Sequence, residues 1–124
     1  MSGASSASSA LFRLDGDVAI VTGAGAGIGR AIAHMLASAG AAIVAADRDG
    51  DAAARTASMA EEIGAAAIAT TTDVSRAGDC ERMIEAAFER FGRIDVLVNN
   101  AGIFRPAALI DAGADLAVVQ QAVD

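Results

Sequence analysis

The chain has 124 residues, which is enough for one domain with a buried core. Hydrophobic residues make up 54% of it and aromatic residues only 3%, a balance that favours helices packed closely on a parallel sheet over an aromatic-rich β-sandwich. The formal net charge of −7 argues against nucleic acid and against an anionic membrane surface as partners.

The first residues and the single cysteine bear on where the chain works. Residues 1–13 begin with a Ser/Ala-rich run that has no basic start and no long apolar stretch. They predict a flexible leader rather than a signal peptide or a membrane span, with one domain over residues 14–124. Cys80 has no second cysteine to pair with and fits the reducing cytoplasm.

A glycine-rich stretch after the first apolar run organises the rest of the chain. Val18–Val21 is typical of a short buried strand, and glycines interrupt it at every second position from Gly23 to Gly29. A helical pattern then starts at Ile28 and ends at Gly40. A strand, a glycine turn and a helix in this order direct backbone N–H groups and a positive helix end at a phosphate.

The predicted face of that helix and the spacing of its glycines are specific. Ile28, Ile32, Leu36 and Ala39 fall on one side of the helix, which we expect to face the core. The spacing does not fit G-x-G-x-x-G, but it fits T-G-x-x-x-G-x-G from Thr22 onward.

Strands and helices alternate through the remaining sequence. The patterns predict strands over 41–46, 65–72 and 94–98. Between them they predict a helix over 51–63 that stops at Gly64, and a helix that Ser75 caps and Gly92 ends. Helical structure is expected again from Ala112 to Asp124. Such alternation gives βαβ units and a parallel sheet with helices on both faces.

These elements predict an α/β, Rossmann-type, doubly wound parallel sheet with strand order 3-2-1-4. The sheet is expected to stop at its fourth strand, with the start of a helix after it. In this order the ligand lies at the switch point, above Gly23–Gly29 and Asn99–Gly102. The strand over 94–98 would be an open apolar edge, so we expect copies of the chain to associate through it and through the apolar stripe of the helix over 116–123.

Asp47 ends the second predicted strand, where a carboxylate can bind both ribose hydroxyls of adenosine and repel a 2′-phosphate. The alternative is an aspartate that only holds a turn or caps a helix. Arg48 alone would favour a 2′-phosphate, but Asp47 precedes it and the glycine turn has no basic residue. The pattern therefore favours NAD over NADP.

Other polar residues have simpler alternatives. Asp73 is either a loop cap or a neighbour of the adenine, and Val74 beside it is either ordinary packing or a second neighbour of the adenine. Asn99 and Asn100 either satisfy loop backbone or frame the cofactor. His34 has no acidic or cysteine partner at metal spacing and is expected on the surface. Cys80 falls on a core-facing helix position and is expected to be unreactive.

Four motifs in order resemble the short-chain dehydrogenases/reductases: Thr22 to Gly29, then Asp47, then Asp73-Val74, then Asn99 to Gly102. The resemblance implies a hydride transfer between NAD and an alcohol or carbonyl substrate. It also implies that the pyrophosphate lies at the first motif, the adenosine ribose at Asp47, the adenine beside Asp73 and Val74, and the nicotinamide beside Asn100 to Gly102. The cofactor-binding residues implied are Thr22, Gly23, Gly25, Ala26, Gly27, Ile28, Gly29, Asp47, Arg48, Asp73, Val74, Asn100, Ala101 and Gly102.

The sequence departs from the family where catalysis is concerned. The family uses a serine and a Tyr-x-x-x-Lys pair, and this chain contains neither tyrosine nor lysine. A proton-relaying asparagine in a Val-Asn step of the family is matched here by Val123-Asp124. No catalytic and no metal-binding residue is therefore predicted. Two interpretations remain: the cofactor-binding half of an oxidoreductase, or a nucleotide-binding module without catalysis.

Overall fold

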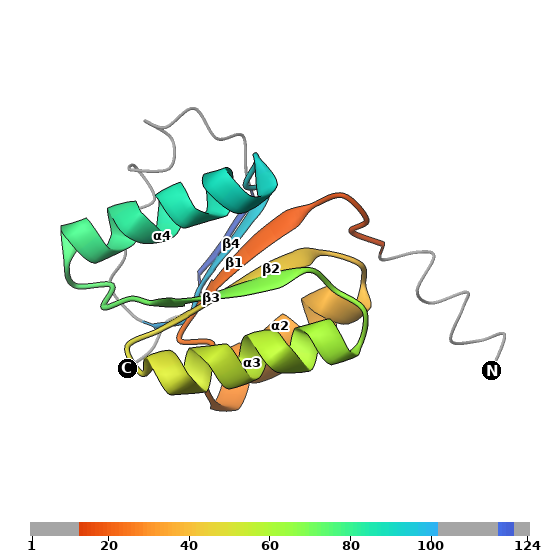
Figure 1. Cartoon of the computed structure of the whole chain (residues 1–124), viewed down its shortest axis with the longest axis horizontal. Coiled ribbons are helices and arrows are strands. Elements are labelled where there is room, and N and C mark those ends of the chain that lie inside the picture. The colour runs from red at the N-terminus through yellow and green to blue at the C-terminus, as the bar shows by residue number, and fades with distance from the viewer. Residues whose placement is uncertain (1–12, 102–116, 121–124) are drawn as a thin grey trace, which may run out of the picture.

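The structure is a computed structural model that describes residues 13–101 and 117–120 (Figure 1). Its elements in chain order are β1 (Val18–Thr22), α2 (Gly27–Ser38), β2 (Ala42–Asp47), α3 (Gly50–Glu62), β3 (Ala67–Thr71), α4 (Ala77–Phe91), β4 (Val96–Asn99) and β5 (Ala117–Gln120). None of the helices within these described ranges is long and apolar enough to cross a membrane.

The strands form one parallel sheet in the order β3-β2-β1-β4-β5. Helix α4 covers one face, and α2 and α3 cover the other (Figure 1). The doubly wound α/β fold and the predicted order 3-2-1-4 are thereby confirmed. In the register, Thr22 pairs with Ala46 on one side and with Asn99 on the other, so the carboxyl ends of these strands meet at one edge.

Two apolar layers hold the helices on the sheet. Val18 and Ile20 of β1 point toward α4, while Ala19 and Val21 point toward α2 and α3, as the two-residue period of a strand requires. Small side chains line the α2 and α3 layer, including Ala33 and Ala37. This explains the alanine-rich composition, because small residues let the helices approach the sheet closely.

The glycine stops after the helices are confirmed. Gly40, Gly64 and Gly92 have φ angles of +103°, +97° and +78°, in the left-handed region that glycine adopts most readily. Each terminates a helix where the sequence predicts it, within one or two residues of the last hydrogen-bonded turn.

The predicted buried face of α2 is wrong in part. Its buried residues are Gly29, Ala33 and Ala37, whereas Ile28 is 57% exposed. The large side chains Ile32 and Leu36 flank this small-residue seam and are half-buried. Apolar periodicity alone gives greater weight to isoleucine and leucine, but the close approach of α2 to the sheet selects glycine and alanine.

Ser75 is not the cap of α4. The helix starts at Ala77, with Arg76 in the capping position and no side-chain capping bond. Both the backbone N–H and the hydroxyl of Ser75 donate to Oδ1 of Asp73, at 3.0 and 2.6 Å. Ser75 thus completes a turn before the helix and leaves the helix terminus to its neighbours.

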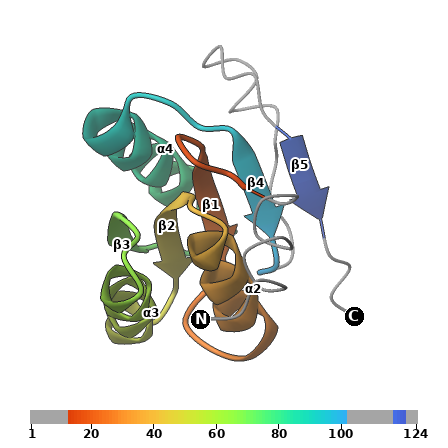
Figure 2. The ribbon, with the colours of Figure 1, turned by 90° about the vertical axis from the view of Figure 1, so that its right-hand side faces the viewer.

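The helix predicted from Ala112 onward is wrong at residues 117–120, which form β5 (Figure 2). β5 pairs in parallel with β4, from Val96 opposite Ala117 to Asn99 opposite Gln120. β4 is therefore not an edge strand, and association of copies through its edge loses its basis. Residues 1–12, 102–116 and 121–124, with the rest of the predicted leader and terminal helix, lie outside the described residues.

Asp95 connects the α4–β4 loop to the start of β1. Its carboxylate accepts the N–H of Val18 at 2.8 Å and pairs with Arg93, and its own N–H donates to the carbonyl of Val18 at 2.9 Å. The bond from Arg93 is the main cause that holds the pKa of Asp95 below its usual range. The ionised carboxylate is thus the form that stabilises the fold.

We therefore expect the stability contribution of Asp95 to depend on pH. A depressed pKa adds stability that is present above the unfolded pKa of about 3.9 and is lost as the pH falls through the folded value. Asp95→Asn should lower the unfolding free energy by about 1 kcal/mol at pH 7, the value of one hydrogen bond to a charged group that is partly screened. Denaturant unfolding of both proteins from pH 7 to pH 3 measures it.

The difference between Asp95→Asn and the unmodified chain should shrink toward pH 3. Glu85→Gln, on the exposed side of α4, is the control and should show no such trend. A difference that is the same at both ends of the range would mean that the Asp95 charge contributes nothing.

Candidate functional site

The glycine-rich turn and the segment after β4 meet at the carboxyl edge of the sheet. The hydroxyl of Thr22 accepts the N–H groups of Asn100 and Ala101, at 3.1 and 3.2 Å. Nδ2 of Asn100 donates to the carbonyl of Gly23 at 3.4 Å. The predicted proximity of the first and fourth motifs is confirmed for these residues, and Gly102 lies outside the described residues.

Asn99 belongs to the same junction from inside the sheet. It is fully buried, and the Thr22 hydroxyl lies 3.3 Å from its Oδ1. Asn100 thus satisfies a backbone carbonyl of the turn, as the simpler alternative predicts, whereas Asn99 accepts the hydroxyl of Thr22.

Strand β2 and helix α3 lie beside the glycine-rich turn and hold its first half by hydrogen bonds. The N–H of Ala24 donates to the carbonyl of Ala46 at 3.0 Å, and the N–H of Gly25 donates to Oδ2 of Asp47 at 2.8 Å. From α3, the hydroxyl of Thr56 donates to the carbonyl of Ala24 at 2.7 Å. Strand β2 and helix α3 therefore both set the conformation of the turn.

The glycines of the turn serve different purposes. A Cβ on Gly25 would lie 2.6 Å from the Cβ of Ala52, and one on Gly29 would collide with the carbonyl oxygen of Gly23. Both are glycine because the protein packs against them. Gly27 has a φ of +55°, and a Cβ on it would have no atom of the described chain within 4 Å. Space is therefore left open beside Gly27.

The open side of the turn faces an uncapped helix start. Ala26, Gly27 and Ile28 are exposed, and Ala26 makes no side-chain capping bond to α2. The first turn of α2 contains no acidic residue. Its backbone N–H groups and the positive end of the helix dipole are thus suited to an anion that approaches over Gly27. The residues present fit a phosphate group.

Asp47 holds the turn and the entry to α3 at the same time. Its second oxygen, Oδ1, accepts the N–H of Asp49 at 2.9 Å, and Asp49 in turn caps α3 by accepting the N–H of Ala52 at 3.1 Å. An ionised carboxylate offers about four acceptor sites, of which two are used here. Acceptor sites of Asp47 therefore remain for a ligand, its place at the ribose stays a prediction, and the exposed Arg48 follows it directly.

Asp73 and Val74 follow β3 at the same edge. The hydroxyl of Ser75, followed by its N–H, holds the pKa of Asp73 below its usual range, so the carboxylate stays ionised near neutral pH. Val74 is half-buried and packs against the core under α4, which agrees with the ordinary packing role. Their places beside an adenine remain a prediction.

The family model described as short chain dehydrogenase matches residues 17–123. The chain belongs to the short chain dehydrogenase family.

Similar short chain dehydrogenases share both sequence and fold with the chain. It is 48% identical over 100 residues to an uncharacterized oxidoreductase of Methylorubrum extorquens, covering 78% of this chain and 40% of that protein. It is 42% identical over 90 residues to 7α-hydroxysteroid dehydrogenase of Escherichia coli, covering 73% of this chain and 35% of that protein. The chain thus spans about two fifths or less of the length of these curated relatives.

Solved short chain dehydrogenase structures match the fold at similar identity. A 7α-hydroxysteroid dehydrogenase in complex with NADH and 7-oxo glycochenodeoxycholic acid has a TM-score of 0.72 and 41% identity, covering 74% of this chain and 36% of that one. A short chain dehydrogenase/reductase from Burkholderia phymatum in complex with NAD has a TM-score of 0.70 and 46% identity, covering 74% of this chain and 33% of that one.

Thr56 is a polar residue beside the glycine-rich turn that the sequence motifs do not indicate. Thr56 is fully buried on α3, on a face that is otherwise formed by alanines such as Ala53, Ala57 and Ala60. A single polar residue on an apolar helix face is the signal that could have found it, since a buried hydroxyl needs a partner.

The predicted positions of two further residues, His34 and Cys80, are confirmed. His34 is exposed on α2, and Cys80 is buried on α4, where burial raises the pKa of its thiol. Within residues 13–101 and 117–120, no three His, Cys, Asp or Glu side chains come together in a way that could hold a metal ion.

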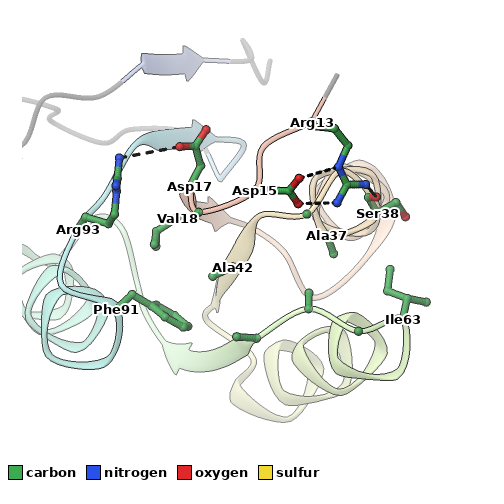
Figure 3. A pocket seen from close by; sticks show the side chains of 15 residues that line it. Arg13, Asp15, Asp17, Val18, Ala37, Ser38, Ala42, Ile63, Phe91 and Arg93 are labelled. Atoms are coloured by element: carbon green, nitrogen blue, oxygen red, sulfur yellow. Dashed lines mark hydrogen bonds and ion pairs between the residues drawn. The ribbon is translucent and has the colours of Figure 1, made fainter. Parts of the chain in front are cut away.

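A cavity of about 470 Å³ lies at the opposite, amino edge of the sheet (Figure 3). Two ion pairs stand at its rim, Arg13 with Asp15 and Arg93 with Asp17, and Phe91 and other apolar side chains contribute to its walls. None of the residues predicted to bind the cofactor lines this cavity. It lies where β1 and β2 begin, away from the turn and the Asn100 segment.

Proposed function

We propose that the chain is the dinucleotide-binding part of an NAD-dependent oxidoreductase that acts on an alcohol or carbonyl substrate. One observation carries the proposal: the open space over Gly27 faces the uncapped start of α2, at the edge where β1 and β4 end. Two similar structures, described as complexes with NADH and with NAD, support it. The proposed domain covers residues 14–124.

In this proposal the chain binds and orients the dinucleotide from several elements. Residues 22–29 bind the pyrophosphate, Asp47 and Arg48 lie at the adenosine ribose, Asp73 and Val74 lie at the adenine, and Asn100 to Gly102 lie at the nicotinamide. When bound, NAD supplies the hydride acceptor for the oxidation of an alcohol. The hydroxyl of Thr22 accepts two N–H groups of the segment at Asn100 and Ala101 and so holds that segment against the turn.

The alternative proposal is a nucleotide-binding module without catalysis, and it is favoured by a sequence that contains neither tyrosine nor lysine. The first proposal requires NAD binding, so titration calorimetry of NAD into the purified chain is the first experiment. A chain that folds, as judged by circular dichroism, but binds no NAD would contradict it, whereas the alternative also allows another nucleotide.

We expect the chain to prefer NAD to NADP. A carboxylate that faces a 2′-phosphate is left without hydroxyl partners and repels the added charge, which should weaken NADP binding by about ten- to a hundredfold. Titrating both nucleotides under the same conditions measures the ratio. Equal or tighter binding of NADP would show that Asp47 does not face the ribose.

Asp47→Asn tests the source of that preference. The variant removes the charge and keeps one acceptor for the N–H of Gly25 or Asp49, so the ratio between NAD and NADP should fall by about tenfold. Asp51→Asn is the matched control: it removes an exposed carboxylate from the first turn of α3, and it should leave the ratio unchanged.

A further inference from the structure

We infer that Thr56 of α3 is a positioning residue that sets the nucleotide affinity of the glycine-rich turn, an inference that rests on the proposed NAD binding. The hydroxyl of Thr56 is fully buried and donates to the carbonyl of Ala24 at 2.7 Å, across 32 positions of the chain. Thr56 belongs to none of the four motifs, and its hydroxyl reaches the turn from α3.

The bond from Thr56 acts on one particular peptide unit. The carbonyl of Ala24 and the N–H of Gly25 belong to the same planar peptide group. Thr56 binds its oxygen end at 2.7 Å, and the carboxylate of Asp47 binds its nitrogen end at 2.8 Å. The plane is thus held from α3 on one side and from the end of β2 on the other, and it cannot rotate without breaking both bonds.

This peptide unit borders the open half of the turn. Ala24 is fully buried, while Ala26 and Gly27 are exposed, and Gly27 adjoins the open space. The orientation of the 24–25 peptide therefore sets the direction in which the chain enters the start of α2. A nucleotide that binds the N–H groups of that helix start gains from a turn that is already in place, because little ordering is left for the binding step.

The position of Thr56 in α3 also favours a role beyond packing. Within a helix, a threonine hydroxyl commonly bonds to the carbonyl three or four residues earlier. Thr56 instead directs its hydroxyl out of α3 to a carbonyl of another segment. The packing between the turn and α3 is tight near Thr56. A Cβ on Gly25 would lie 2.6 Å from the Cβ of Ala52, which precedes Thr56 by one turn of α3.

Thr56→Val separates the hydroxyl from the packing of the side chain, because valine keeps nearly the same shape. It leaves the carbonyl of Ala24 without its donor, and we expect NAD to bind about tenfold more weakly, the fold-change that one lost hydrogen bond gives. Thr56→Ser keeps the hydroxyl and loses a methyl group, so it should lower thermal stability and restore the affinity of the unmodified chain. Calorimetric titration of NAD and thermal unfolding measure the two quantities.

Ala60→Gly is the matched control for general weakening of α3. Ala60 is buried on the same face one turn after Thr56, and its carbonyl accepts the N–H of Ala65 at 3.0 Å, near the end of α3. The control should lose stability and keep its NAD affinity. If Thr56→Val binds like the unmodified chain, or if affinity follows stability in all three variants, the positioning role is wrong.

Two further measurements keep the outcomes distinct. If Thr56→Val does not fold, Thr56→Cys takes its place, since a thiol is only a weak donor and should bind NAD with reduced affinity. Unchanged affinity in that variant would overturn the inference. If the folded, unmodified chain itself binds no NAD, the proposed function has failed; if it binds and Thr56→Val binds equally well, only the role of Thr56 has failed.

Discussion

Gly27→Val is expected to abolish NAD binding, with a loss of affinity of about a hundredfold or more. A valine side chain at this position would fill the one part of the turn that the described chain leaves open, beside the start of α2. A phosphate held there would lose its approach to the backbone N–H groups, which amounts to several hydrogen bonds to a charged group of about 1.5–3 kcal/mol each. Titration calorimetry with NAD measures the loss.

Gly64→Val is the matched control for backbone strain. Gly64 has a φ of +97° and Gly27 a φ of +55°, and a Cβ on either would have no described atom within 4 Å. Both substitutions therefore place a branched side chain in a left-handed conformation, at a cost of about 1–2 kcal/mol. Gly64 ends α3 at the amino edge of the sheet, so the control should lose stability and bind NAD normally.

The comparison of the two variants decides the role of the turn. If both fold and both bind NAD like the unmodified chain, the turn does not hold the pyrophosphate. If both lose binding equally, the effect is strain and not the blocked site. Only a loss confined to Gly27→Val supports the proposed position of the phosphate.

The sheet order and the helix stops could be predicted because they depend on local signals. Gly40, Gly64 and Gly92 each follow an amphipathic run, and each adopts the positive φ that ends a helix. Alternating strands and helices then leave few topologies, since crossovers between parallel strands are right-handed. The order 3-2-1-4 follows from these constraints together with the glycine turn after the first strand.

Other features of the fold depend on contacts that are distant in the sequence. The small-residue seam of α2 is decided by how closely the helix approaches the sheet, and the exposed Ile28 carries no local sign of this. Residues 117–120 include Ala117, Val118 and Val119, a short apolar run that fits a strand as well as a helix turn. Pairing with β4, which local patterns cannot reveal, decides for the strand.

The candidate site divides in the same way. The motifs gave Thr22, Asp47 and Asn100, because strand ends in a parallel sheet converge at one edge. They could not give the bond from Thr56 to Ala24, which joins α3 to the turn and follows no spacing rule. Asp47 holds two backbone N–H groups, as the turn alternative for this residue predicts, and its place at the ribose stays a prediction.

The chain of 124 residues is expected to bind NAD and to transfer no hydride. Oxidation of an alcohol also requires a group that takes a proton from the reacting oxygen, and such positioned groups typically contribute about 10²–10⁴ in rate. The family resemblance assigns this task to tyrosine with the help of lysine, and the sequence contains neither. The binding part and the proton-transfer part of the reaction are therefore expected to separate in this chain.

The titratable groups at hand are poorly suited to replace that pair. The hydroxyl and N–H of Ser75 lower the pKa of Asp73, so its carboxylate is a weak base for the proton of an alcohol and a poor proton donor to a carbonyl near neutral pH. Cys80 is buried on the core side of α4, and burial raises the pKa of its thiol. His34 is exposed in the middle of α2, and the hydrogen bonds that join the turn to Asn100 are made by other residues, Thr22 and Gly23.

A direct assay tests this expectation on a purified, monodisperse preparation of the chain. NAD binding is first established by calorimetry, and NADH formation is then followed by absorbance with a panel of alcohols and sugars, and NADH consumption with ketones. Gly27→Val, which should not bind the cofactor, gives the background rate. Rates equal to that background, in a preparation that binds NAD, support the separation of binding from proton transfer. Turnover well above it would mean that a residue within these 124 takes the proton from the alcohol or gives it to the ketone, and Asp47 and Asp73, both at the binding edge, would be the first to substitute.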